Sequence, residues 1–419
     1  MLNRFKSVVL SAQFKKLTVY GFGQLFNLVT PLLIVPYVVG ICGEENFGKT
    51  AIGMSIAFFM IVFVDFGSDI VGVKQISTNR NNPKELNRII SINYILKLVL
   101  LLLCIIISFV LFSSLEYFRV EKKLFLLSLT IVIGQFLNPS WILQGLENFK
   151  VFSFLNVVSK SVYMLLVFVL VKNETDYVWI NFFFGIGTIV SSIIVLFYMT
   201  KYYKIKLILV SKNELIEYFN SHKTFVFSQI FTWIQLYSPV ILLSFVGSKL
   251  IVGQFRIIDQ ILSIFKTYII LSFNFIFPKI CFDLNDNIPK GINRWKLFNG
   301  VSLCLVVILL SGVYIFSFEL VDYFNTTNKY FLDNLLKVSL LYPIAFFMVF
   351  VLKQLLLAVD ENKLYSRTTI FMSILNVAGI LIGYKIYGLT GVFYSFILIE
   401  LLTCLLFFLI LRKKTNYLG

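Results

Sequence analysis

The sequence predicts an all-α membrane protein with about twelve transmembrane helices. Its 419 residues are 58% hydrophobic and only 14% charged. A water-soluble fold could not bury so much apolar surface. Inside a bilayer every backbone polar group needs a partner within the protein, which leaves helices or a closed barrel. The apolar stretches are continuous rather than alternating, and this pattern favours helices.

Twelve apolar stretches are long enough to cross a bilayer, whose core of about 30 Å requires about 20 helical residues. None of the gaps between them is longer than roughly 25 residues, so a separate soluble catalytic or DNA-binding domain has no room to fold. In chain order the expected spans are 17–40, 51–73, 89–113, 124–146, 152–171, 178–199, 224–246, 250–277, 297–316, 334–357, 368–387 and 389–411.

The basic residues gather in every second gap between these spans. With both termini in the cytoplasm, the inner gaps contain 25 of the 37 Lys and Arg residues and the outer gaps contain eight. Cytoplasmic loops of membrane proteins show this excess. The net charge of +16 therefore indicates orientation and contact with anionic lipid headgroups rather than nucleic-acid binding.

The first span follows a basic segment and contains Pro31 and Pro36. It is long and lacks a small-residue cleavage site, so we expect an uncleaved span rather than a signal peptide. The seventh span contains Pro239. A proline inside a helix removes a hydrogen bond and allows a kink. These kinks are either hinges that let a bundle open or static bends that improve packing.

Two short repeats indicate that the chain consists of two related halves. An amide residue stands three positions before a hydroxyl-proline pair in both halves, at Asn27 and at Gln235. A Leu-Asn-Val triplet also recurs, at 155–157 and 375–377. Paired repeats are typical of transporters, with the substrate path between them. The expected organisation is a six-helix bundle at 1–199, a cytoplasmic linker at 200–223 and a second six-helix bundle at 224–419.

The residues that commonly bind metals are sparse. The chain has one histidine, His222, and five scattered cysteines without a C-x-x-C pair. This distribution predicts neither a disulfide framework nor a zinc site. No metal centre and no bound cofactor are expected.

Several ionisable residues lie inside the expected spans, where each costs about 2.5–3.5 kcal/mol to insert and usually faces a cavity. Arg256 and Asp259 lie on one face of a helix and can pair with each other. Lys266 follows about two turns later on roughly the same side. Lys97 and Lys337 lie within two or three turns of a span end, so they either face a cavity or extend to the interface.

Two further acids stand out in the apolar segments. Asp65 lies at the inner end of the second span, and Glu400 lies in the middle of the twelfth. Glu400 is either a site that couples transport to a proton or sodium ion, with a pKa raised by desolvation, or a hydrogen-bonded packing residue. Together with Asp259, these acids are the candidates for coupling or charge pairing.

A series of short motifs runs through the chain in a fixed order. They are Asn27, Pro31 and Pro36 in the first span, Gly48 just before the second, then Asp65-Phe66-Gly67, then Pro139, Trp141, Gln144 and Gly145 around the fourth span, then Asp259, and finally Asn376, Gly388 and Glu400. In order and spacing they resemble the Wzx-type O-antigen and polysaccharide flippases of the multidrug/oligosaccharidyl-lipid/polysaccharide (MOP) exporter superfamily. One departure is Gln260, where the family often has a basic residue.

The resemblance implies a MATE-like fold and a flippase rather than an enzyme. Its substrate would be an undecaprenyl-diphosphate-linked oligosaccharide, such as an O-antigen or capsule repeat unit, used in lipopolysaccharide biosynthesis. Alternating access would move it from the cytoplasmic to the periplasmic leaflet of a bacterial inner membrane, with H⁺ or Na⁺ as candidate coupling ions. A polysaccharide polymerase and a chain-length regulator are the candidate protein partners, besides membrane lipids.

A doubly charged pyrophosphate cannot cross hydrocarbon without compensating positive charge. Arg256, Lys266, Lys97 and Lys337 are therefore the residues expected to line a cationic substrate path. Trp141, Gln144 and Asn138 are candidates for sugar contacts, although helix packing explains such residues more often.

Three alternatives remain open at this point. A multidrug or cation antiporter has the same architecture, but its cavity would favour acidic residues. A peptidoglycan-precursor flippase usually has two additional spans. A membrane-embedded polysaccharide polymerase or glycosyltransferase would be an enzyme with a large outer loop, whereas the longest outer loop here is roughly 317–333.

Overall fold

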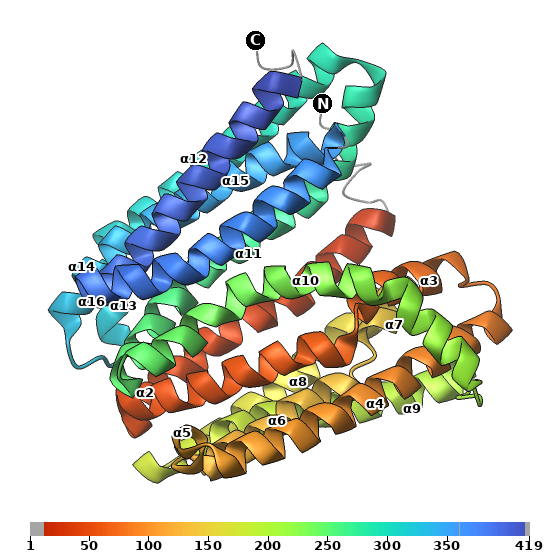
Figure 1. Cartoon of the computed structure of the whole chain (residues 1–419), viewed down its shortest axis with the longest axis horizontal. Coiled ribbons are helices and arrows are strands. Elements are labelled where there is room, and N and C mark those ends of the chain that lie inside the picture. The colour runs from red at the N-terminus through yellow and green to blue at the C-terminus, as the bar shows by residue number, and fades with distance from the viewer. Residues whose placement is uncertain (1–11, 360, 415–419) are drawn as a thin grey trace. The chain divides into compact units, whose positions relative to one another are not determined.

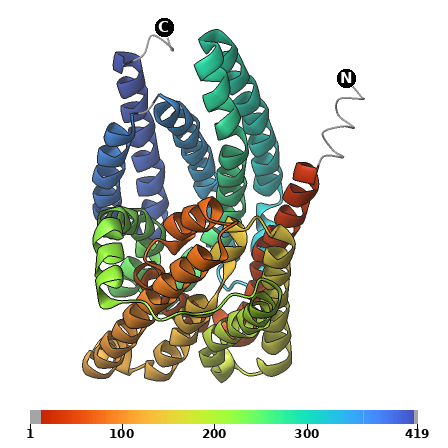
Figure 2. The ribbon, with the colours of Figure 1, turned by 90° about the vertical axis from the view of Figure 1, so that its right-hand side faces the viewer.

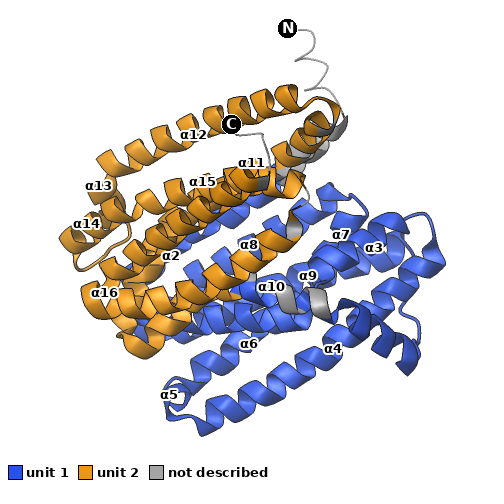
Figure 3. Ribbon diagram, turned by 45° about the horizontal axis from the view of Figure 1, so that its top comes forward, with its two compact units in different colours: residues 1–233 blue, residues 234–419 orange. Residues whose placement is uncertain are grey.

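The computed structural model describes residues 12–359 and 361–414 (Figure 1). These residues form helices joined by turns and loops, and no β-strand occurs among them. The predicted all-α class is therefore confirmed. The chain divides into two compact units, one up to Trp233 and one from Ile234 onward, which Figure 3 draws in blue and orange.

The N-terminal unit consists of long apolar helices with short helices at their ends. They are α2 (Ala12–Asp65), the π-helix η1 (Ser68–Gly72), α3 (Val73–Thr78), α4 (Pro83–Ser114), α5 (Glu116–Arg119), α6 (Lys122–Leu137), α7 (Ser140–Gly145), α8 (Phe149–Leu170), the 3₁₀ helix η2 (Glu174–Trp179), α9 (Ile180–Tyr202) and the first part of α10 (Lys212–Val246). Polar caps fix where several of these helices begin. Asn82 accepts a hydrogen bond from the Glu85 amide at the start of α4, and Asn148 accepts one from the Val151 amide at the start of α8.

The C-terminal unit continues with the remainder of α10 and six further helices. They are α11 (Lys249–Asp286), α12 (Ile288–Ile315), α13 (Ser317–Tyr323), α14 (Lys329–Ser339), α15 (Leu341–Ala358) and α16 (Asn362–Lys414). Ser248 and Asn287 cap α11 and α12 in the same way as the asparagines of the first unit. Helices α11, α12, α15 and α16 run beside one another, as Figures 1 and 2 show.

Nine helices in the described part of the chain are long and apolar enough to cross a membrane, so this is a multi-pass membrane protein. Two of them are about twice the length that one crossing needs. The segment Gly21–Asp65 contains a non-helical Gly43, and the segment Lys363–Lys413 contains a break at Tyr387 and Gly388. Both glycines have a positive φ, a conformation that favours glycine. The count of twelve crossings and the cytoplasmic termini stay predictions.

The outward faces of the long helices are apolar. Along α4 the exposed large apolar side chains are Leu98, Val99, Leu102, Leu103, Ile106, Ile107, Phe109, Val110 and Leu111. A water-soluble monomer rarely exposes a continuous apolar stripe of this length. The stripe is the surface that a helix presents to lipid, and the buried polar groups accordingly lie inside the bundle.

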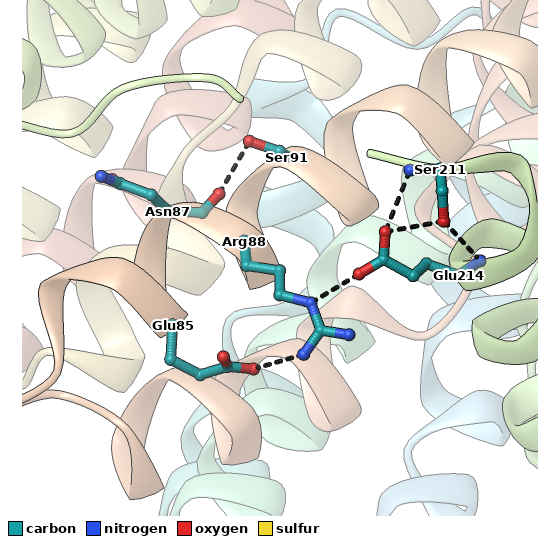
Figure 4. A network of polar contacts seen from close by, with 6 residues as sticks. All are labelled: Glu85, Asn87, Arg88, Ser91, Ser211 and Glu214. Atoms are coloured by element: carbon teal, nitrogen blue, oxygen red, sulfur yellow. Dashed lines mark hydrogen bonds and ion pairs between the residues drawn. The ribbon is translucent and has the colours of Figure 1, made fainter. Parts of the chain in front are cut away.

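The loop between α9 and α10 is attached to the N-terminal unit by polar contacts. The amide of Lys206 donates to Asn87 Oδ1, and the amide of Ile208 donates to Ser91 Oγ. Figure 4 shows that Arg88 of α4 then bridges Glu85 and Glu214, at the start of α10. The boundary between the units lies within α10, at Trp233 and Ile234, so the first part of that helix belongs with the N-terminal unit.

Removing the Glu214 carboxylate should loosen this loop. Hydrogen bonds from Ser211 and from Arg88 lower the pKa of Glu214 from its ordinary value of 4.5. A carboxylate with a lowered pKa contributes stability above its ordinary pKa and loses it as the pH falls through the lowered value. At pH 7 we expect trypsin to cleave the loop about two- to fivefold faster in Glu214→Gln than in the wild type, because surface ion pairs are weak. Equal cleavage rates in the two proteins would show that the Glu214 carboxylate does not hold the loop.

Small residues let helices α8 and α9 approach closely. A Cβ atom at Gly187 of α9 would lie 2.4 Å from the Ser159 backbone oxygen of α8. Contacts of this kind are common where membrane helices pack. The close approach positions the turn of α8 that contains Ser159 and Lys160.

Gly187→Ala should therefore destabilise the N-terminal unit by about 1–3 kcal/mol, because backbone rather than a flexible side chain must move. Gly300→Ala in α12 is the matched control, since a Cβ there meets nothing within 4 Å. Thermal unfolding in detergent should show a lower midpoint for Gly187→Ala and little change for Gly300→Ala. Equal midpoints would contradict the tight α8–α9 packing.

Candidate functional site

The first charged group in the N-terminal unit is an ion pair between two helices. Lys97 Nζ of α4 lies 2.9 Å from Asp65 Oδ1 at the end of α2, and only 2% of the Lys97 side chain is exposed. The Gln135 amide of α6 donates to Asp65 Oδ2 at 3.0 Å. Helix α2 ends here because Phe66 and Gly67 both have positive φ. Lys97 therefore does not extend to the interface, and its charge is compensated by Asp65.

The motif around the fourth expected span builds the support for this pair. Pro139 precedes α7, and the Trp141 ring lies 5.4 Å from Lys97 Nζ, within cation–π range. Trp141 is buried and packs against Gly72, where a Cβ would meet its ring at 2.8 Å. Gly145 lies against Ile76 of α3. The structure therefore gives Trp141 and Gly145 a packing role.

A polar cavity of about 120 Å³ lies in the same unit, between α2, α6, α8 and α9. Asn27, predicted from the family motif, is one of the residues that line it. Gln135 connects the cavity to the Asp65–Lys97 pair through its hydrogen bond. The other lining residues are Phe58, Ile61, Ile131, Asn138, Leu155, Asn156, Ser159, Lys160, Phe184 and Thr188.

Lys160 is the site residue that sequence reasoning missed. The count of 25 basic residues in the inner gaps includes Lys160, and this placement is wrong. Lys160 lies near the middle of α8, lines the cavity and has its Nζ 4.0 Å from the centre of the Phe184 ring. Its position inside the expected span 152–171 was the available signal.

The second charged group lies on α11 in the C-terminal unit. Asp259 accepts from Arg256 Nη1 at 2.7 Å and from Lys266 Nζ at 2.6 Å, so one carboxylate is shared by two cations. The pairing of Arg256 with Asp259 agrees with their spacing of three residues. Arg256 remains 29% exposed, whereas Lys266 is 14% exposed. This trio carries one positive charge in excess.

Two residues of other helices face Lys266. Its Nζ lies 5.7 Å from the centre of the Tyr342 ring on α15. Glu400 of α16 is 5% exposed and interacts electrostatically with Lys266. Helices α11, α15 and α16 thus bring two basic and two acidic residues of the predicted set into one cluster.

Lys337 is placed differently from the other predicted cations. It lies on the short α14, pairs with Asp333 at 2.8 Å, and is 34% exposed. Its second contact is the Tyr314 ring, 5.7 Å away. Within the described residues its contacts are local, and none joins it to the α11 trio.

The predicted hinge residues lie in regular helix. Pro31 and Pro36 lie inside α2, whose non-helical residue is Gly43, and Pro239 lies inside α10. Gly48 and Gln144 lie in α2 and α7. In this state none of the three prolines interrupts its helix, so their role as hinges stays a prediction.

Comparison with known proteins adds a family and a fold. A family model described as "Polysaccharide biosynthesis protein" matches residues 14–281. A protein described as "Putative O-antigen transporter" from Shigella dysenteriae is 25% identical over 400 residues, which cover 92% of this chain and 96% of that protein. A second protein with this description, from Escherichia coli (strain K12), is 24% identical over 269 residues and 64% of each chain.

Solved structures of two transporter types share the fold. Lipid II flippase MurJ in an inward closed conformation matches with a TM-score of 0.75 and 13% identity, covering 94% of this chain and 87% of its own. An inward-facing multidrug resistance MATE family transporter of the MOP superfamily matches with a TM-score of 0.69 and 14% identity, covering 95% and 97%. At these identities the likeness concerns the fold, and it confirms the predicted MATE-like architecture.

Proposed function

Because the chain belongs to the polysaccharide biosynthesis protein family, we propose that it is a flippase that moves a lipid-linked oligosaccharide across the membrane. The transporter function predicted from the sequence is supported by the two relatives described as O-antigen transporters. The fold shared with lipid II flippase MurJ agrees with it. In the more specific form of this proposal, the substrate is an undecaprenyl-diphosphate-linked repeat unit. It moves from the cytoplasmic to the periplasmic face of a bacterial inner membrane.

The observation that carries this proposal is the cluster around Asp259. The substrate headgroup carries a pyrophosphate, whose charge needs compensation inside hydrocarbon. Arg256 and Lys266 supply two positive charges against one carboxylate, and Arg256 keeps part of its surface exposed. A phosphate oxygen that accepts from Arg256 would form a charge-assisted hydrogen bond. The lipid tail would stay in the bilayer throughout.

Glu400 suggests how transport could be coupled to an ion. When Glu400 is ionised, it offsets the excess positive charge through Lys266. When it is protonated, the cluster regains that charge and attracts an anionic headgroup. A ligand drives alternating access only through different affinities for the two states. A cation that changes the cluster's charge provides such a difference, and both H⁺ and Na⁺ stay candidate coupling ions.

The function is tested by deleting the gene and measuring two quantities. We expect loss of the surface polysaccharide and accumulation of the lipid-linked repeat unit with its sugar accessible from the cytoplasmic side only. A plasmid copy of the wild type should restore both. Normal surface polysaccharide in the deletion strain, with increased drug sensitivity instead, would favour the antiporter.

A further inference from the structure

We propose that the cavity of the N-terminal unit binds one small oxyanion, a carboxylate or phosphate group, through Lys160 and Asn156. The cavity lies in the N-terminal unit, whereas the Asp259 cluster belongs to the C-terminal unit. As a subsite for an acidic group of the transported oligosaccharide, it rests on the proposed function. As a binding site for an anion, it rests on the side chains alone.

The first observation is that Lys160 differs from Lys97 and Lys266, the two lysines that form ion pairs in the predicted charge clusters. Lys97 and Lys266 each have an aspartate oxygen within 3 Å. Lys160 contacts the face of Phe184, and within the described residues no carboxylate lies within ion-pair distance of it. A charged group inside an apolar span usually faces a cavity or a partner. Lys160 faces the cavity, so a ligand would supply the missing partner.

The second observation comes from Asn156, one helical turn before Lys160 on α8. Residues four apart lie on the same face of a helix, and both side chains line the cavity. The Nδ2 atom of Asn156 is buried and finds no acceptor in the described part of the chain. A buried donor without an acceptor is unfavourable, and native proteins rarely leave one unmatched. Lys160 and Asn156 therefore place two hydrogen-bond donors without an acceptor in the same small cavity.

The remaining polar groups of the lining already bond one another or neighbouring side chains. These bonds are Asn27 to Gln24 at 2.9 Å, Gln135 to Asp65 at 3.0 Å, Asn138 to Gln135 at 3.2 Å, and Ser159 with Thr188 at 3.3 Å. The donors left over are Lys160 and Asn156, and both require an acceptor. An anion satisfies both at once.

The composition and size of the cavity define the ligand further. None of the lining residues is acidic, and the nearby Asp65 is occupied by Lys97 and Gln135, so a metal cation would find no anionic ligand. A volume of about 120 Å³ is well below the roughly 300–1,000 Å³ of pockets that bury a drug-sized ligand. The cavity therefore accommodates a single charged group and not a whole sugar repeat.

The test measures the thermal unfolding midpoint of the full chain in lipid nanodiscs. Sodium phosphate and sodium acetate are compared with sodium chloride at equal ionic strength. An anion that binds the folded state raises the midpoint as its concentration increases. We expect this rise in the wild type, and an apparent affinity at least about tenfold weaker in Lys160→Gln.

Three further variants keep the test decisive. Lys160→Arg retains the charge and should retain most of the rise. Asn156→Ala should weaken the affinity, and it replaces Lys160→Gln if that variant does not fold. Lys353→Gln is the matched control, because Lys353 is also held by aromatic rings, those of Phe273, Phe350 and Tyr365. A wild type without a phosphate- or acetate-dependent rise, or an equal rise in Lys160→Gln, overturns the proposal.

Transport of lipid-linked oligosaccharides with acidic or neutral sugars then identifies the source of the anion. If Lys160→Gln slows transport of the acidic substrate alone, the site binds a group of the substrate. If it abolishes phosphate binding and leaves transport unchanged, the site binds a free anion. Failure of the wild type to transport either substrate would refute the proposed function, whereas the phosphate titration would still decide the site.

Discussion

Replacing Lys97 by Met is expected to lower the free energy of unfolding by about 3–5 kcal/mol. The substitution keeps the length of the side chain and removes its charge. Asp65 would then remain in the bundle, 13% exposed, with the Gln135 amide as its remaining hydrogen-bond donor. A buried carboxylate that loses its cation costs far more than the pair contributes when both members are present. Thermal unfolding in detergent and the yield of monodisperse protein both measure this loss.

The double substitution Lys97→Met with Asp65→Leu is the informative control. It removes both charges, and apolar replacement of a complete buried pair is often close to neutral. The double variant should therefore be more stable than either Lys97→Met or Asp65→Leu alone. A coupling energy near zero in this cycle would show that the two residues do not depend on each other.

The membrane class and the positions of the helices were predictable because long apolar segments have few alternatives in lipid. The expected spans 17–40 and 51–73 also predicted a break between them, and the non-helical Gly43 lies in that gap with a positive φ. The division of the chain inside α10 was not predictable. The first part of α10 contacts residues of the N-terminal unit that are far away in sequence, as Tyr218 does with Asn93 and Glu214 with Arg88.

Within the candidate site, local pairs were predictable and long-range pairs were not. Arg256 and Asp259 lie three residues apart on one helix, so their spacing alone indicates contact. Lys97 and Asp65 are 32 positions apart in the sequence and lie on different helices. Only the packing of α2 against α4 brings the two side chains together. Lys160 was misassigned because a count of basic residues by gap does not show which lysines lie inside a helix.

Lys266→Gln is expected to reduce transport by about tenfold or more, because it removes a charge-assisted contact worth about 1.5–3 kcal/mol. In the wild type Asp259 is shared by Arg256 and Lys266, which leaves one positive charge in excess when Glu400 is protonated. Without Lys266, Arg256 and Asp259 neutralise each other, and the headgroup finds no surplus charge. Arg256→Gln should have a similar effect through the remaining Lys266–Asp259 pair. Surface polysaccharide, normalised to the amount of protein in the membrane, measures both variants.

The double variant Lys266→Gln with Asp259→Asn separates charge supply from structural pairing. It leaves Arg256 without a competing carboxylate, so the excess positive charge returns and transport should recover in part. If the trio only stabilises the fold, removing a second member should instead deepen the defect and lower the amount of protein in the membrane. Lys290→Gln is the matched control, because its ion pair with Asp286 is exposed and lies outside the predicted substrate path. Wild-type transport by both Lys266→Gln and Arg256→Gln would refute the role of this cluster, since no positive excess would then be required for the headgroup to cross.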